Sequence, residues 1–253
     1  MSRNTWDGIY SSFEEVPISG KGFDSETWLE NSRKRIYSIL ETPKHNGAVP
    51  LMETCRESLL PLLAAIVSEE LKTVRILDFG GGLGSDFVSV IKSISNGESV
   101  EYYVVESEKM CDLGNVVFSN DTRIQFRPSL PDDIKTADIV HLGSSLHYIS
   151  DWQQMIQRLA SYNPRFFIFT DLPVGNFHTY ASAQNYYGSK IPCWFFNFRE
   201  FVEQMRSVGF HLTFKSSYVY RRMNVDVEYR QDNFPEEYRL GQSSTLLFCA
   251  ETA

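Results

Sequence analysis

The chain has 253 residues, of which 42% are hydrophobic and 22% charged, a composition typical of a soluble globular protein and unlike collagen, coiled coils or disordered chains. A formal net charge of −8 argues against nucleic acid as a partner, because binding it needs clustered cations that displace phosphate counterions. The run Arg33-Lys34-Arg35 is a small basic patch that could still contact an anionic partner locally. Aromatic residues are unusually frequent, at 14%.

The cysteines and apolar stretches indicate the compartment. Cys55, Cys111, Cys193 and Cys249 lie far apart and form neither a Cys-x-x-Cys pair nor a zinc pattern. We therefore expect reduced thiols in a cytoplasmic protein and no metal site. The N-terminus lacks the apolar core of a signal peptide. The longest apolar stretch, residues 62–67, is too short to span a membrane, so we expect no membrane insertion.

The predicted elements divide the chain near residue 50. Residues 1–50 are predicted to be an N-terminal extension that can serve as a lid, with one helix from about Ser25 to Glu41. Residues 51–253 are predicted to form one domain of alternating helices and strands. Its expected strands are 74–79, 100–105, 124–126, 137–142 and 165–170. Its expected helices are 51–72, restarted near Pro61, then a helix capped by Ser85 or Asp86, then 151–160 and 198–208. Asn197, with Glu200 three residues later, is predicted to form a capping box at the start of the last helix.

The last third of the chain predicts a different arrangement. Residues 172–197 are rich in aromatics without a clear period, which favours an inserted substrate loop. Strands at 211–220 and 244–250 have no helix between them and are expected to pair antiparallel at one edge. The polar residues 221–243 are expected to be an exposed excursion. We thus predict an α/β fold with a doubly wound, mostly parallel seven-stranded sheet.

A glycine cluster follows the strand at 74–79 and carries the strongest chemical signal. Glycines there let the backbone turn sharply and approach a ligand closely. The pattern Gly-x-Gly-x-x-Gly of NAD-dependent oxidoreductases is not met, because its third position falls on Ser85 or Phe87. No P-loop lysine follows either. The observed pattern, Asp-x-Gly-x-Gly-x-Gly from Asp78 through Gly84, resembles the first motif of class I S-adenosylmethionine (SAM) methyltransferases.

This resemblance implies a set of residues that bind SAM. Asp78 would lie near the cationic amino end of the ligand, and Glu106, at the end of the next strand, would accept the ribose hydroxyls. Ser129 and Leu130 would lie beside the adenine, with Asp132 or Asp133 as a further contact. The full predicted cofactor set is Asp78, Gly80, Gly81, Gly82, Gly84, Glu106, Ser129, Leu130, Gly143 and Ser144.

The segment after the fourth strand is expected to line the floor beneath the methyl group, because ligands of doubly wound sheets lie at the carboxyl ends of the strands. Residues 144–149 resemble the fourth motif of small-molecule methyltransferases. His147 is a candidate catalytic base there, although the same motif often packs beside the cofactor without chemistry. His141, inside the strand pattern, is interpreted as a core histidine.

Two more candidate bases follow the fifth strand. Asp171 can take a proton from a substrate hydroxyl or orient it, and the alternative is a turn or helix-cap carboxylate. His178 is the other candidate, on the predicted substrate loop. No convergent carboxylate cluster is apparent in the motifs, which disfavours a metal-assisted reaction.

Three further motifs resemble a narrower family of bacterial methyltransferases associated with surface-polysaccharide gene clusters. They are Trp6-x-Gly8-x-Tyr10-x-Ser12-Phe13-x-Glu15 with Gly22-Phe23-Asp24, then Leu146-His147-Tyr148-Ile149, and Pro192-Cys193-Trp194-Phe195-Phe196. The resemblance implies methylation of a small molecule at a sugar or related hydroxyl, with SAM as the donor. A non-catalytic SAM-binding or partner-binding protein on the same scaffold is the alternative. The sequence predicts no oligomeric state.

Overall fold

A computed structural model describes residues 4–41, 59–94, 99–218, 220–222, 225–227, 229 and 231–251. Two compact units make up the chain. The first, here called the glycine-loop unit, comprises residues 26–143 and 161–168. The second, here called the aromatic unit, comprises residues 1–25, 144–160 and 169–253. Among the described residues, no helix combines the length and apolar character needed to cross a bilayer.

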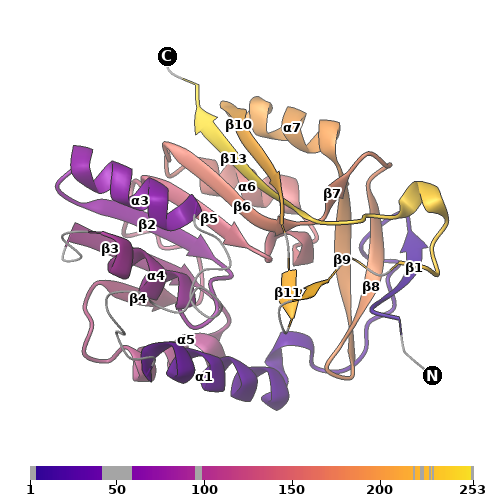
Figure 1. The fold of residues 1–253 in the computed structure, drawn as a ribbon, viewed down its shortest axis with the longest axis horizontal. Coiled ribbons are helices and arrows are strands. Elements are labelled where there is room, and N and C mark those ends of the chain that lie inside the picture. The colour runs from indigo at the N-terminus through magenta and orange to yellow at the C-terminus, as the bar shows by residue number, and fades with distance from the viewer. Residues whose placement is uncertain are drawn as a thin grey trace. The chain divides into compact units, whose positions relative to one another are not determined.

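In the part of the chain that the structure describes, the main sheet has seven strands, which confirms the predicted fold class (Figure 1). β2 pairs parallel with β3 and with β5, and β3 pairs parallel with β4. β10 and β13 pair antiparallel at one edge, as expected. The order is β10 (Phe210–Ser217), β13 (Ser244–Ala250), β6 (Phe166–Leu172), β5 (Ile139–Gly143), β2 (Val74–Phe79), β3 (Val100–Val105) and β4 (Ile124–Arg127).

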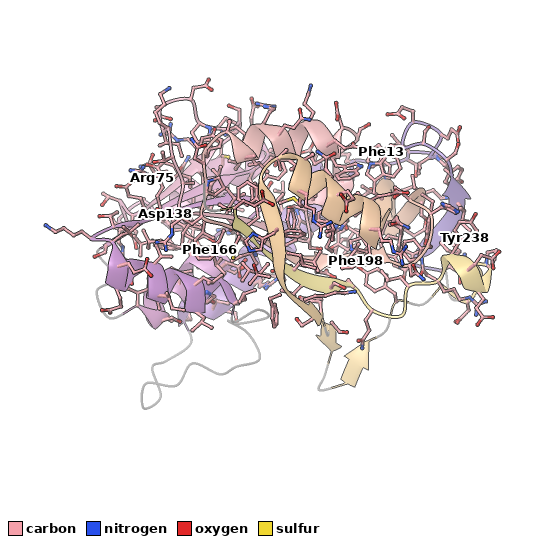
Figure 2. The ribbon with its side chains drawn as sticks, turned by 90° about the horizontal axis from the view of Figure 1, so that it is seen from above. Phe13, Arg75, Asp138, Phe166, Phe198 and Tyr238 are labelled. Carbon is pink, nitrogen blue, oxygen red and sulfur yellow. The ribbon has the colours of Figure 1, made fainter. Side chains whose placement is uncertain are left out.

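The parallel strands of the glycine-loop unit are apolar along their length because both of their faces are covered. In β3 five of the six residues are buried. Arg75 and Asp138 fasten β2 to the chain entering β5, since the Arg75 amide donates to Asp138 Oδ2 at 2.7 Å (Figure 2). The helices described in this unit are α1 (Glu26–Glu41), α3 (Leu59–Glu70), α4 (Ser85–Ser93) and α5 (Glu108–Val117).

Two of these helices differ from the prediction. The helix expected over 51–72 is described from Leu59, and residues 51–58, like the domain boundary predicted near residue 50, lie outside the described residues. Pro61 is tolerated in the first turn of α3, because the amide that proline lacks has no helical partner there. The sequence reading missed α5.

Much of the aromatic unit is a second sheet, which corrects the expectation of a loop without regular structure over 172–197. Its strands are β1 (Trp6–Tyr10), β8 (Tyr180–Tyr186), β9 (Ser189–Asn197) and β7 (Val174–Gly175), in that order. β8 and β9 form a hairpin closed by Tyr187 and Gly188, both at positive φ, as tight hairpin turns require. The N-terminal residues 6–10 are therefore the edge strand of this sheet.

The described helices of the aromatic unit are η1 (Gly22–Asp24), η3 (Leu146–Tyr148), α6 (Trp152–Ala160), α7 (Phe198–Ser207) and η4 (Glu236–Tyr238). Of these, α6 and α7 confirm the helices predicted over 151–160 and 198–208, whereas the short helices η1, η3 and η4 were not predicted. Asn197 caps α7 as expected, because its side chain accepts from the amides of Arg199 and Glu200. In a capping box the Glu200 side chain would accept from the backbone amide of Asn197. Here that backbone amide donates to the Thr179 hydroxyl, which in turn donates to Glu200. Thr179 therefore bridges the two residues of the predicted capping box.

Aromatic side chains fill the core of this unit. Trp6 packs edge-on against Phe195 at 4.9 Å, and Phe195 stacks on Tyr180 at 4.8 Å. Phe234 and Leu240 are buried in the same cluster. Most described positions from 232 to 242 are exposed, as expected of this segment, but Gln231, Phe234 and Leu240 are buried and anchor it in the core. Near its start lie β11 (Tyr220–Arg222) and β12 (Val225–Val227). Much of the aromatic excess is ordinary core.

Candidate functional site

The glycine loop connects β2 to α4 and includes backbone conformations with positive φ, which residues other than glycine rarely adopt. Gly82 has φ of +57°, and apart from its two chain neighbours no described residue has an atom within 4 Å of a Cβ built there. A Cβ on Gly81 would instead lie 2.2 Å from Asp78 Oδ2. Gly84, at φ +74°, is the N-cap of α4, which corrects the expected cap at Ser85 or Asp86. The loop therefore offers open space beside Gly82 and is closed against its own strand at Gly81.

Glu106 lies directly beside this loop. Its Oε1 accepts from the Gly82 amide at 3.1 Å, and its Oε2 accepts from the Ser107 amide at 2.9 Å. The two segments meet because β2 and β3 are parallel neighbours whose carboxyl ends share one sheet edge. The structure thus brings together the two strongest sequence-predicted elements of the cofactor site, and both are only half-buried.

Asp78 is placed differently from its neighbours in the motif. Its side chain is fully buried, and both carboxylate oxygens have partners inside the glycine-loop unit. Tyr102 donates its hydroxyl to Oδ2 at 2.7 Å, and His141 Nδ1 lies 2.8 Å from Oδ1. Burial, followed by the charge of Asp78, raises the pKa of Tyr102 well above its usual value, so this phenol stays protonated and remains a donor. The sequence reading missed Tyr102 and interpreted His141 as core alone.

The other predicted cofactor residues lie at the ends of the neighbouring strands. Ser129 is exposed and Leu130 buried, two and three residues after the end of β4. Asp133, which with Asp132 is a candidate for a further contact, pairs with Arg127 at 2.9 Å. Gly143 ends β5 in the glycine-loop unit. Each of these positions lies at or shortly after the carboxyl end of its strand, and its role in cofactor binding stays a prediction.

Ser144 and Asp171 form a strained pair in the aromatic unit. Their φ angles are +54° and +56°, a region that costs a residue other than glycine on the order of 1–3 kcal/mol. Ser144 donates its hydroxyl to Asp171 Oδ2 at 3.0 Å and its amide to the Thr170 carbonyl at 2.8 Å. Such strain persists where surrounding contacts enforce it, and it concentrates at active sites.

Two residues from the last tenth of the chain, Tyr229 and Ser243, also contact Asp171. Ser243 donates to Oδ1 at 2.5 Å, and Tyr229 donates to the same oxygen at 3.3 Å. Burial, and after it the charge of Asp171, raises the pKa of Tyr229 and of Cys193. These groups therefore stay protonated around one carboxylate. The sequence reading missed Tyr229 and Ser243, because their segment was expected to be exposed.

His147 is buried and its chemistry is limited by that burial. Its side chain is 2% exposed, and its Nδ1 has no hydrogen-bond partner among the described residues. The ring packs on Tyr148 with centroids 4.2 Å apart. Burial lowers the pKa of His147 to about 3, so the imidazole is neutral at physiological pH and a weak base. His178, the other candidate histidine, is exposed between β7 and β8.

The buried His147 predicts a pH dependence of stability. The unfolded imidazole binds a proton below its usual pKa of 6.5, whereas the folded one does so only near 3. The unfolded state therefore binds more protons in this window, and the protein loses up to roughly 5 kcal/mol as pH falls through it. We expect His147→Leu to remove this loss, measured by urea unfolding from pH 7 to pH 4. His178→Leu, at an exposed site, should leave it unchanged, and a His147→Leu curve parallel to the wild type would contradict the assignment.

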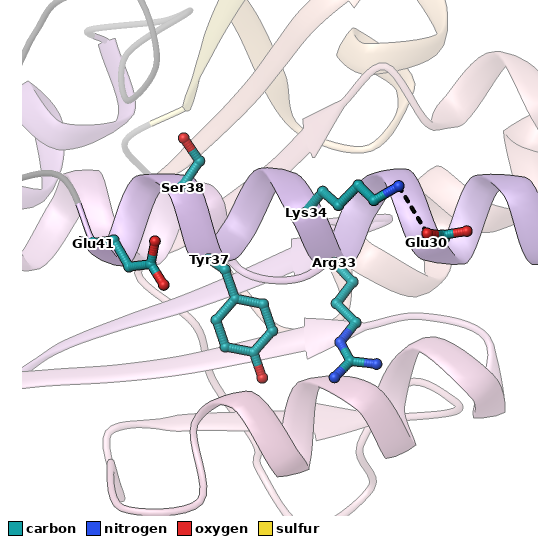
Figure 3. Close-up of a pocket in the computed structure, with 6 residues that line it drawn as sticks. All are labelled: Glu30, Arg33, Lys34, Tyr37, Ser38 and Glu41. Atoms are coloured by element: carbon teal, nitrogen blue, oxygen red, sulfur yellow. Dashed lines mark ion pairs between the residues drawn. The ribbon is translucent and has the colours of Figure 1, made fainter.

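A pocket on α1 holds none of the predicted site residues. It has a volume of about 720 Å³, and Figure 3 shows its described lining, which is Glu30, Arg33, Lys34, Tyr37, Ser38 and Glu41. Lys34 pairs with Glu30 at 2.7 Å, with both side chains largely exposed. This pocket includes two residues of the basic patch seen in the sequence, and its cations are accompanied by carboxylates, so the patch gives no support for nucleic-acid binding.

A family model described as a methyltransferase domain matches residues 49–213. None of the curated proteins compared matches the sequence.

Solved structures share the fold at low sequence identity. The 1,6-didemethyltoxoflavin N1-methyltransferase of Burkholderia thailandensis, solved with S-adenosylhomocysteine, is 13% identical over 97% of this chain and 95% of its own, with a TM-score of 0.53. Magnesium protoporphyrin IX methyltransferase of Synechocystis, solved with SAM, is 15% identical over 90% and 93%, with a TM-score of 0.51. A SAM-dependent methyltransferase of Clostridium acetobutylicum is 12% identical over 88% and 99%, with a TM-score of 0.53. At these identities the likeness shows the fold alone.

Proposed function

The chain belongs to the family of methyltransferase domains, whose model spans residues 49–213, and from this membership we propose that it methylates a hydroxyl group of a small molecule, with SAM as the methyl donor. The main support for a hydroxyl acceptor is Asp171 in the aromatic unit, which has strained backbone and a carboxylate that accepts from three hydroxyl groups.

The glycine-loop unit fits SAM in its donor set. When bound, SAM supplies a methyl group activated on a sulfonium. The open space beside Gly82 leaves room for the ligand, and the Glu106 carboxylate beside it suits a pair of ribose hydroxyls. Two of the similar solved structures hold SAM or S-adenosylhomocysteine, which supports the same ligand here. Leu130, buried after β4, would pack against the adenine.

Asp171 is the proposed acceptor-binding carboxylate and general base. In the reaction the acceptor oxygen forms a bond to the methyl carbon while the carbon–sulfur bond breaks and its electron pair returns to sulfur. The hydroxyl proton must leave, and Asp171 accepts it. Ser144, Ser243 and Tyr229 hold the carboxylate in place, which keeps its geometry fixed for an acceptor.

A sugar or a related polyol is the acceptor that we propose. Half-buried aromatic rings and a carboxylate are the mixture of groups expected of such a site. Tyr148 packs edge-on against Phe23 at 4.8 Å, and its hydroxyl donates to Gln184 at 2.8 Å. These side chains and Tyr229 are less buried than the aromatic core. They offer both apolar faces and polar edges within one unit.

The test is transfer of a labelled methyl group. The purified chain is incubated with methyl-labelled SAM and a panel of sugars, nucleotide sugars, phenols and amines. We expect label in a hydroxylated acceptor, blocked by Asp171→Asn. Label in amines alone would contradict the hydroxyl assignment. Binding of SAM without transfer to any acceptor would support the alternative of a non-catalytic SAM-binding protein.

A further inference from the structure

Three buried polar side chains in the glycine-loop unit have no part in the proposed chemistry. Asp78, Tyr102 and His141 come from the neighbouring strands β2, β3 and β5 and are 0%, 0% and 2% exposed. A buried carboxylate is costly unless donors satisfy it, and here two donors do so, at 2.7 and 2.8 Å. The strand register sets Asp78 opposite His141. Three strands therefore meet at one carboxylate.

This carboxylate lies directly under the glycine loop. The carboxylate of Asp78 occupies the place where a side chain of Gly81 would start, with only 2.2 Å from the built Cβ to Oδ2. On the next strand, a Cβ built on Gly143 would lie 3.0 Å from the His141 ring. The loop and the end of β5 are thus both packed against this network. A shift of the Asp78 carboxylate toward the loop would press on the backbone of Gly81, which borders the open space at Gly82.

We propose that Asp78, held by Tyr102 and His141, is a positioning residue that fixes the glycine loop, so that cofactor affinity depends on two side chains lying beneath the site. This proposal deepens the proposed function, because the expected effect on cofactor affinity rests on the assignment of SAM to this site. Asp78 would then act through the loop backbone, with its oxygens engaged below the loop. The Tyr102 hydroxyl and His141 Nδ1 hold the Asp78 carboxylate in place, so both groups contribute to the position of the loop.

The first test uses Tyr102→Phe, which removes one hydroxyl and little volume. The dissociation constant of S-adenosylhomocysteine, measured by calorimetry, is expected to rise about tenfold, the equivalent of one hydrogen bond. Amide hydrogen exchange of residues 80–84 is expected to accelerate. Tyr103→Phe is the matched control, because it lies next on β3 and its side chain points to the opposite face. It should change neither quantity.

His141 provides a second test by rescue. His141→Leu removes the donor and is expected to weaken S-adenosylhomocysteine binding at least as much as Tyr102→Phe. His141→Asn keeps a donor near the place of Nδ1 and should restore most of the affinity. A purely structural histidine would not show this rescue, because both variants lose the ring.

The outcomes separate this proposal from the function on which it rests. If wild type binds S-adenosylhomocysteine and Tyr102→Phe and His141→Leu bind it equally well, the positioning role is wrong and the cofactor assignment stands. If wild type does not bind it, the cofactor assignment fails. The exchange measurement then still decides the positioning role, since unchanged exchange at residues 80–84 in Tyr102→Phe would overturn it.

Discussion

Replacing Asp171 with asparagine is expected to lower the rate of methyl transfer by roughly 10²–10⁴-fold, the usual contribution of a positioned base. Asparagine keeps the size of the side chain and can still accept one hydrogen bond from Ser144 or Ser243, but it cannot take the acceptor proton. It also tolerates the positive φ that Asp171 adopts. We therefore expect a folded protein with unchanged affinity for S-adenosylhomocysteine, measured by single-turnover kinetics beside calorimetry.

Ser243→Ala serves as the comparison for Asp171→Asn. It removes one of the donors to Asp171 Oδ1 and leaves the carboxylate, with Tyr229 as the remaining donor to that oxygen. Its rate should fall far less than that of Asp171→Asn. Equal rates for Asp171→Asn and wild type would remove Asp171 from the chemistry. His147, with its pKa lowered to about 3 by burial, and the exposed His178 would then be tested next as bases.

Replacing Glu106 with alanine is expected to weaken SAM binding by roughly 100-fold, since two hydrogen bonds to an ionised group are lost. The Gly82 and Ser107 amides would also lose their acceptor, which loosens the loop. Calorimetric titration with SAM measures the change. Glu108→Ala removes an equal charge two residues later at an exposed position. It should bind SAM like wild type, and equal affinities for both variants would contradict the ribose role of Glu106.

The parts of the site that could be predicted from the sequence are those encoded locally. The glycine spacing after β2 and the acid after β3 each lie within one strand and its turn, and parallel pairing brings their ends to one sheet edge. Asp171 could be named as a candidate for the same reason, because it lies near the end of β6, just after the apolar run 166–169. Asn197 was readable as a cap from the spacing to Glu200 alone.

The parts that were missed depend on contacts far apart in the chain. Tyr229 and Ser243 reach Asp171 across 58 and 72 residues, and nothing in their polar neighbourhood marks them as partners. Tyr102 contacts Asp78 only because β2 and β3 take one particular register. The β8–β9 hairpin was hidden because Tyr187 and Gly188 lack the usual Asn-Gly turn signal and Pro192 lies inside β9.

The central claim is that the glycine loop and Glu106 form a SAM site rather than a dinucleotide site. Calorimetric titration of the purified chain with SAM, S-adenosylhomocysteine and NAD⁺ tests it most directly, with Glu106→Ala titrated in parallel. We predict saturable binding of the first two ligands at one site per chain, weakened in Glu106→Ala, and no binding of NAD⁺. Saturable binding of NAD⁺ with no binding of SAM or S-adenosylhomocysteine would contradict the account.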